Sequence, residues 1–148
     1  RARGRPRRAG TRLDGRPPAV TERGLTDTSV FIARETRRPI EIVAMPDRLA
    51  VPVITMGELR AGVLAATETV IRDRRLDTLT AALSLEPIPI DVEVANAWAR
   101  LRLALREADL RMPVNDSWIA ATAMALGVPV VTQDDDFPAI SELDVITV

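Results

Sequence analysis

Apolar and polar residues alternate along this chain in blocks that predict short strands and longer helices in turn. The short apolar or extended runs are residues 24–27, 49–54, 87–90, 128–132 and 145–148. The patterns with a helical period cover about residues 28–35, 55–67, 69–83, 91–108 and 116–126. Since strands that alternate with helices form parallel sheets covered by helices, the pattern predicts an α/β domain with three layers.

Single residues mark where some of these elements begin and end. Asp91 is a candidate N-cap for the helix that follows it, and Gly127 is placed to end the 116–126 helix in a left-handed conformation. Pro52 lies inside the apolar run 49–54. Because proline cannot donate to a strand ladder, this run is expected to be an edge strand or to begin late.

Charge is distributed unevenly, although the net charge of the chain is only −1. Residues 1–24 hold eight arginines and two acids, whereas residues 25–148 hold twelve arginines and nineteen acids. Residues 1–23 are rich in Arg and Gly and lack an apolar period, so we expect a disordered extension ahead of a folded domain at 24–148. The extension has two open interpretations: an arm that binds nucleic acid, or an upstream addition from an early start site.

The amino-acid composition restricts the chemistry that the chain can perform. The chain contains no histidine, no cysteine and no lysine. This composition excludes serine–histidine and cysteine–histidine nucleophiles, thiolate metal sites and disulfides. No apolar run approaches the length of a membrane span and no secretory signal is visible, so a soluble cytoplasmic protein is expected.

Four acidic residues stand where an open α/β sheet displays its ligand site. Asp27 ends the first predicted strand, and Asp134 follows the 128–132 strand by two residues. The carboxyl ends of strands are where such sheets bind ligands. Glu58 and Asp116 lie at predicted helix starts, which can face the same rim. Because clustered carboxylates without His or Cys favour hard divalent cations, we expect Mg²⁺ or Mn²⁺ at this place.

Each of these acids also has a purely structural interpretation. Glu58 could close a capping box with Thr55, and Asp27 or Asp116 could cap the helix that follows it. Asp134 begins a run of three aspartates that could form a solvated turn. Taken together, however, these structural interpretations do not explain why so many acids have no cation to pair with.

Other small α/β proteins that rely on acids do not fit this sequence. Haloacid-dehalogenase-like phosphatases and receiver domains place an aspartate after the first strand, but both also use a lysine, which this chain lacks. Neither common glycine-rich phosphate-binding loop is present. Metal-assisted hydrolysis, most naturally of a phosphodiester, is the chemistry that remains.

Four segments resemble, in their order and spacing, the motifs of PIN-domain ribonucleases, most of all the VapC toxins of bacterial toxin–antitoxin pairs. The segments are Leu25–Ile32, Gly57–Val63, Asn115–Ala123 and Val131–Phe137. The third segment is the most specific, and the resemblance covers about residues 24–148. Family members usually begin just before the first aspartate, so residues 1–23 depart from the family pattern.

The resemblance implies a three-layer PIN-like α/β fold with a mainly parallel, five-stranded sheet. It also implies an endoribonuclease that depends on Mg²⁺ or Mn²⁺ and cleaves RNA with a metal-activated water. Carried over by position, the acids that would hold the metal are Asp27, Glu58, Asp116 and Asp134, with Asp136 as an assisting acid. The polar residues that would contact a water or a phosphate are Thr28, Ser29 and Thr132.

The resemblance also implies partners. A cognate VapB-like antitoxin would lay an amphipathic segment into an apolar groove beside the site, and the chain would form a homodimer or a hetero-oligomer with it. Arginines outside the acidic quartet would grip RNA, with Arg60 and Arg111 as candidates and a solvated surface as their alternative. Two other functions stay open: a PIN-like module that binds RNA or protein without cutting, and a metal-dependent DNA nuclease or phosphatase.

Overall fold

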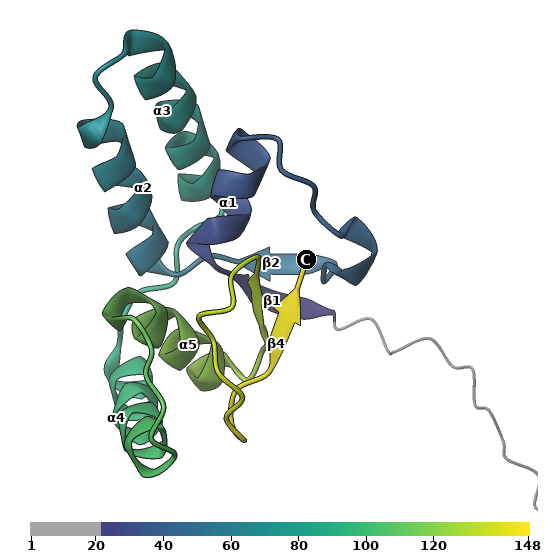
Figure 1. Cartoon of the computed structure of the whole chain (residues 1–148), viewed down its shortest axis with the longest axis vertical. Coiled ribbons are helices and arrows are strands. Elements are labelled where there is room, and N and C mark those ends of the chain that lie inside the picture. The colour runs from purple at the N-terminus through teal and green to yellow at the C-terminus, as the bar shows by residue number, and fades with distance from the viewer. Residues whose placement is uncertain (1–21) are drawn as a thin grey trace, which may run out of the picture.

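The computed structural model describes residues 22–148, in which five helices surround a parallel sheet (Figure 1). The strands are β1 (Arg23–Thr26), β2 (Arg48–Ala50), β3 (Val130–Thr132) and β4 (Val145–Thr147). The helices are α1 (Thr28–Glu35), α2 (Val53–Ala65), α3 (Thr69–Leu83), α4 (Val92–Glu107) and α5 (Val114–Leu126), with a short 3₁₀ helix, η1 (Ile42–Ala44), before β2. The predicted parallel α/β architecture is confirmed.

The order of the strands decides where a ligand site can form. All neighbouring strands are parallel, and their order is β2-β1-β3-β4. The chain leaves β1 for β2 on one side and returns, after helices α2 to α5, to β3 on the other side. Strand order therefore reverses between β1 and β3, and α/β sheets bind ligands outside the carboxyl ends of strands at such a reversal.

Alternation along β1 and β3 directs particular side chains to the face that α4 and α5 cover. Leu25 and Val130 are partners across the two strands, and both are fully buried in the main core cluster. The α4 and α5 members of that cluster are Leu101, Leu105, Ile119, Ala120 and Ala123. Since side chains alternate with a period of two, Asp27 and Thr132 emerge on this same face.

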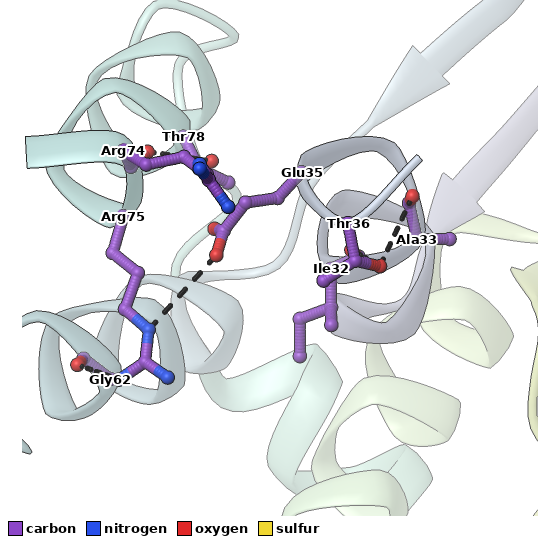
Figure 2. A network of polar contacts seen from close by, with 8 residues as sticks. All are labelled: Ile32, Ala33, Glu35, Thr36, Gly62, Arg74, Arg75 and Thr78. Carbon is purple, nitrogen blue, oxygen red and sulfur yellow. Dashed lines mark hydrogen bonds and ion pairs between the residues drawn. The ribbon is translucent and has the colours of Figure 1, made fainter. Parts of the chain in front are cut away.

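The hairpin of α2 and α3 lies beside α1 and extends away from the sheet (Figure 1). Figure 2 shows how Arg75 of α3 joins the three helices. Its guanidinium donates to the carbonyl of Gly62 in α2 at 2.6 Å and pairs with Glu35 at the end of α1 at 4.0 Å. Apolar contacts in the hairpin complete the connection through the buried side chains Leu59, Val63, Leu79 and Ala82.

Among the described residues, the sheet has one strand fewer than the five that the resemblance implies, and the extended piece at 87–90 does not form a strand. Ile88 forms only an isolated parallel bridge to Pro52. Pro87 and Pro89 flank Ile88, and because proline has no N–H to donate, no ladder extends from the bridge. The sheet of residues 22–148 therefore has four strands.

Two helices begin earlier than the sequence pattern predicts. α2 starts at Val53 and α5 starts at Val114, each two residues before its predicted start, and the residue before each is a proline. A proline is tolerated there because the first N–H groups of a helix have no partner inside it. Glu58 and Asp116 therefore lie within their helices, and their interpretation as capping residues is wrong.

Other predicted boundaries are confirmed. α1 and α3 have the predicted bounds, Asp91 caps α4 by accepting from the N–H of Val94, and Gly127 ends α5 with a φ of +65°. Residues 1–21 of the predicted arginine-rich extension (1–23) lie outside the described residues. Between residues 22 and 148, no helix is long and apolar enough to cross a membrane.

Candidate active site

Asp27 is a buried acid at the carboxyl end of β1, with only 3% of its surface exposed. Its Oδ1 accepts from the backbone N–H of Thr28 at 2.7 Å, so that Asp27 is also the N-cap of α1. Its Oδ2 accepts from the hydroxyls of Ser29 at 2.7 Å and Thr132 at 2.9 Å. These three donors satisfy the buried carboxylate and fix its orientation.

Ser29 and Thr132 join α1 to the loop after β3 while they hold Asp27. Each hydroxyl has a single proton, which it donates to Asp27, so that its oxygen is free to accept. Ser29 Oγ accepts from the backbone N–H of Gln133 at 3.0 Å, and Thr132 Oγ1 accepts from that of Asp134 at 3.0 Å. The position of Asp134 is thus tied to that of Asp27 through two buried hydroxyls.

Glu58 reaches the same network from α2. Its Oε1 accepts from the hydroxyl of Thr28 at 2.8 Å, and the Thr28 hydroxyl oxygen lies 2.9 Å from that of the fully buried Thr55. Since Thr28 has one proton, which it gives to Glu58, Thr55 is the donor in the second contact. The half-buried Glu58 side chain is therefore directed toward α1 and does not return to the start of its own helix.

Asp116, in the first turn of α5, is exposed to the charges of the other acids. Its side chain is half-buried. Burial of its carboxyl, and after that the negative charges of Asp27, Asp136, Glu58 and Asp134, raise the pKa of Asp116 to about 7. Near neutral pH this carboxyl is therefore protonated in a substantial fraction of molecules. The structure brings the four predicted acids and Asp136 into one electrostatic group.

Asp134 and Asp136 lie in the exposed loop after β3. Partial desolvation of its carboxyl, and the charges of Asp27 and Asp136, raise the pKa of Asp134, while Arg38 opposes that shift. Arg38 also donates to the backbone carbonyl of Ser29 at 3.5 Å. Sequence reasoning did not identify Arg38, because it stands in a turn after α1 where no periodicity or motif marks it.

Gln133 is a second residue that sequence reasoning did not single out. Its Nε2 donates to the backbone carbonyl of Pro39 at 2.7 Å and to that of Val148 at 2.9 Å. The loop that carries Asp134 is therefore fixed to the turn after α1 and to the last residue of the chain. The signal was present, since Gln133 lies inside the segment Val131–Phe137 that carries the family resemblance.

The donors fit a hard divalent cation in chemistry and in charge, although they do not form a closed ligand set. All are carboxylate oxygens, which Mg²⁺ and Mn²⁺ prefer. Within residues 22–148, the ion pairs are those of Arg75 with Glu35 and of Arg100 with Glu142. None of the clustered acids therefore forms an ion pair with an arginine of these residues. Among the same residues, no three acidic side chains are close enough to ligate one ion. Binding a cation would therefore require the carboxylates to draw together.

Comparisons with known proteins identify relatives of this chain. The PIN domain profile matches residues 25–143. Ribonuclease VapC5 of Mycobacterium tuberculosis is 50% identical over 117 residues, which cover 79% of this chain and 87% of that protein. Ribonuclease VapC4 of the same organism is 49% identical over 131 residues, which cover 85% of this chain and 97% of that protein.

Solved structures give the same result for the fold. A member of the VapBC family of toxin–antitoxin systems from Mycobacterium tuberculosis, VapBC-5, matches with a TM-score of 0.79 and 45% identity, over 86% of this chain and 99% of that one. FitAcB from Neisseria gonorrhoeae matches with a TM-score of 0.67 and 25% identity, over 82% of this chain and 94% of that one.

Proposed function

This chain belongs to the VapC ribonucleases of the PIN-domain family, and we propose that it is an endoribonuclease toxin that depends on Mg²⁺ or Mn²⁺. The observation that carries the proposal is the gathering of five acids from four segments. Burial of the Asp116 carboxyl, and after that the negative charges of the other four acids, raise the pKa of Asp116 to about 7. Carboxylates that gather without an arginine partner repel one another, and a bound cation would relieve that repulsion. Carboxylate oxygens are also the ligands that Mg²⁺ and Mn²⁺ prefer. The ribonuclease names of both curated relatives support RNA as the substrate.

The residues have distinct roles in this proposal. Asp27 and Asp116 would hold the cation most directly, and Glu58 and Asp134, assisted by Asp136, would hold it through water or hold a second ion. When bound, the cation would supply an activated water and neutralise the charge that develops on the phosphate. A carboxyl must lose its proton to bind a cation, so Asp116 would release a proton when the cation binds. The affinity for the cation should therefore rise with pH through about 7.

The hydroxyls around these acids position them for that task. Thr132 and Ser29 already donate to Asp27, and Thr28 donates to Glu58. Because these side chains are buried and bonded, they restrict the rotamers of two ligand carboxylates before substrate arrives. In this arrangement a carboxylate would contact the water or the phosphate. The hydroxyls could do so only after giving up their hydrogen bonds to Asp27 and Glu58.

A cognate antitoxin is the proposed protein partner. A hollow of about 200 Å³ opens between α1, α2 and α3, and its lining joins apolar Ile32 and Leu59 to the acid Glu58. An amphipathic segment could bury apolar side chains there, and a basic side chain from the partner could reach the acids. VapBC-5, which this chain resembles, belongs to a toxin–antitoxin family. An RNA substrate and a co-expressed antitoxin imply a cytoplasmic location.

A cleavage assay separates this proposal from the two alternatives. The full chain is incubated with total RNA, or with single-stranded DNA, in Mg²⁺ and in excess chelator, beside the variant Asp116→Asn. We expect cleavage of RNA by the wild type in Mg²⁺ alone, and none by Asp116→Asn, because the neutral amide keeps the shape but loses the anionic ligand. Binding of RNA without cleavage would indicate a binding module, and cleavage of DNA alone would indicate a DNA nuclease.

A further inference from the structure

A second cleft lies outside the acidic site, between the second half of α4 and the segment 108–113 that leads into α5. Its volume is about 710 Å³, and three arginines line it: Arg102, Arg106 and Arg111. Leu103 and Leu110 contribute exposed apolar surface, and no acid from the described residues belongs to the lining. The cleft is therefore both basic and partly apolar.

The three arginines are available to a ligand. Their side chains are exposed, and none of them forms an ion pair or donates a side-chain hydrogen bond to another described residue. The arginines that do so within residues 22–148 are Arg38, Arg72, Arg75 and Arg100. Glu107 and Asp109 are close in sequence to this cleft but do not line it.

Contacts between α4 and α5 connect this cleft to the helix that carries Asp116. The indole N–H of Trp98 donates to Ser117, the residue after Asp116, at 2.9 Å. The rings of Trp98 and Trp118 are stacked with their centroids 4.6 Å apart. Arg102 lies one helical turn beyond Trp98, and its guanidinium carbon stands 5.4 Å from the centre of that ring. The basic cleft is therefore linked to the first turn of α5, which carries Asp116, through Arg102, Trp98 and Ser117.

Electrostatics requires such a surface if the substrate is RNA. Residues 25–148 carry twelve arginines against nineteen acids, and five acids gather where the phosphodiester would react. A polyanion approaching that group is repelled until a cation binds, so its affinity has to come from positive charge nearby. Arginine suits this role because its planar guanidinium can bind a phosphate through two donors.

We propose that the cleft lined by Arg102, Arg106 and Arg111 binds the phosphate backbone of single-stranded RNA and leads it to the acids at the start of α5. This inference rests on the proposed ribonuclease function and names the surface that grips the substrate. Arg102, held over Trp98, is the member linked to the first turn of α5 through the bond from Trp98 to Ser117. Leu103 and Leu110 provide apolar surface on which a base can rest. Since phosphate contacts carry no sequence information, the cleft contributes affinity and register, not the choice of sequence.

The test compares salt dependence in matched variants of the full chain. One variant replaces Arg102, Arg106 and Arg111 by Gln. The control variant replaces Arg34, Arg48 and Arg74 by Gln as well; these three arginines are exposed and do not line the cleft. Binding of a labelled oligo-U RNA of about 16 nucleotides is measured in chelator over a series of KCl concentrations. The arginines of residues 1–21 are common to all three proteins, so differences in slope belong to the replaced residues.

We expect the slope of log K against log salt to become shallower by about 2 in the cleft variant, since each phosphate contact contributes about 0.7 for single strands. The control should change the slope by much less. In Mg²⁺, KM for RNA cleavage should rise in the cleft variant while kcat stays near that of the wild type. An equal slope and KM in the cleft variant and the control would overturn the inference.

Two further outcomes separate this inference from other possibilities. If the cleft variant keeps the wild-type RNA slope but escapes inhibition by a co-expressed antitoxin, the cleft binds protein and the inference is overturned. If the wild type cleaves no RNA in Mg²⁺ while the slope still falls in the cleft variant, the cleft does bind RNA and the nuclease proposal fails. Binding and cleavage therefore test the two proposals separately.

Discussion

At the scale of single residues, Asp27 serves the fold and the site with the same carboxylate. One oxygen caps α1 through the N–H of Thr28, and the other receives the hydroxyls of Ser29 and Thr132. The structural and the functional interpretations of this acid are therefore compatible. A change at a residue that holds Asp27 should affect both stability and activity.

Thr132→Val tests this coupling, because valine keeps the shape and removes the hydroxyl. The change deletes a donor to Asp27 and leaves the N–H of Asp134 without its acceptor. We expect a loss of about 1–3 kcal/mol in the free energy of unfolding, together with a clear fall in kcat. Thr122→Val is the control, since its buried hydroxyl bonds only to the carbonyl of Trp118 in its own helix. A lower kcat in the control as well would show that any buried hydroxyl has this effect.

Asp116→Asn should stabilise the metal-free protein in a pH-dependent way. The pKa of Asp116 is raised to about 7 in the folded chain, so the folded state binds a proton that the unfolded state releases from about pH 4 upward. The wild type therefore loses stability as pH rises from about 4 to 7, and the variant lacks this contribution. Allowing for solvent screening, the difference above about pH 7 is about 1–2 kcal/mol, or 2–6 °C in Tm.

Melting curves of both proteins in chelator, over a pH series, measure this difference. Below about pH 3 the two melting temperatures should differ least, since Asp116 is then mostly protonated in both the folded and the unfolded wild type. A variant that is less stable than the wild type above about pH 7 would mean that Asp116 is not repelled by its neighbours.

At the scale of elements, β1 depends on a close approach that only glycine permits. A Cβ at Gly24 would lie 2.7 Å from Cγ2 of Val131 and 2.8 Å from Cγ of Pro46. Gly24→Ala should therefore push β1 away from β3 and lower the free energy of unfolding by about 1–3 kcal/mol. Activity should fall as well, because β1 and β3 present Asp27 and Thr132.

Gly57→Ala is the matched control for that change. Gly57 lies inside α2, and a Cβ there would meet nothing within 4 Å. Alanine favours the helix, so unfolding should cost about 0.5–1 kcal/mol more in this variant. Denaturant titration of both variants gives the comparison. If Gly24→Ala were as stable as the wild type, the close approach of β1 to Val131 and Pro46 would not limit the side chain at position 24.

Much of the element pattern could be predicted from the sequence, and proline accounts for much of what could not. The helical period predicted the bounds of α1 and α3, and the residue types of Asp91 and Gly127 predicted the N-cap of α4 and the end of α5. Pro52 and Pro113 begin helices whose first residues the apolar pattern had assigned to a strand or a loop. Ile88, between two prolines, had an extended pattern but lacked the neighbouring donors that a strand needs.

At the scale of the whole molecule, topology brings together acids that are far apart in sequence. Thr132 of β3 bonds directly to Asp27 after β1, although the two are 105 positions apart in the sequence. The order β2-β1-β3-β4 produces this contact, and single-sequence patterns do not contain strand order. The places of the acids after predicted strands and at predicted helix starts indicated that they could share one rim, but the strand order itself was not predicted. Arg38 remained hidden, because its approach to Asp134 depends on how a turn is placed in space.

The proposed function requires these acids to bind a hard cation at one site, and the shift of the melting temperature by Mg²⁺ tests that requirement most directly. The full chain and Asp116→Asn are melted at about pH 8 in chelator and in millimolar Mg²⁺ or Mn²⁺. Since a cation that binds only the folded state stabilises it by mass action, we predict that the wild-type Tm rises by several degrees and the variant's Tm rises much less. A wild-type Tm that does not move with either metal would contradict the shared site.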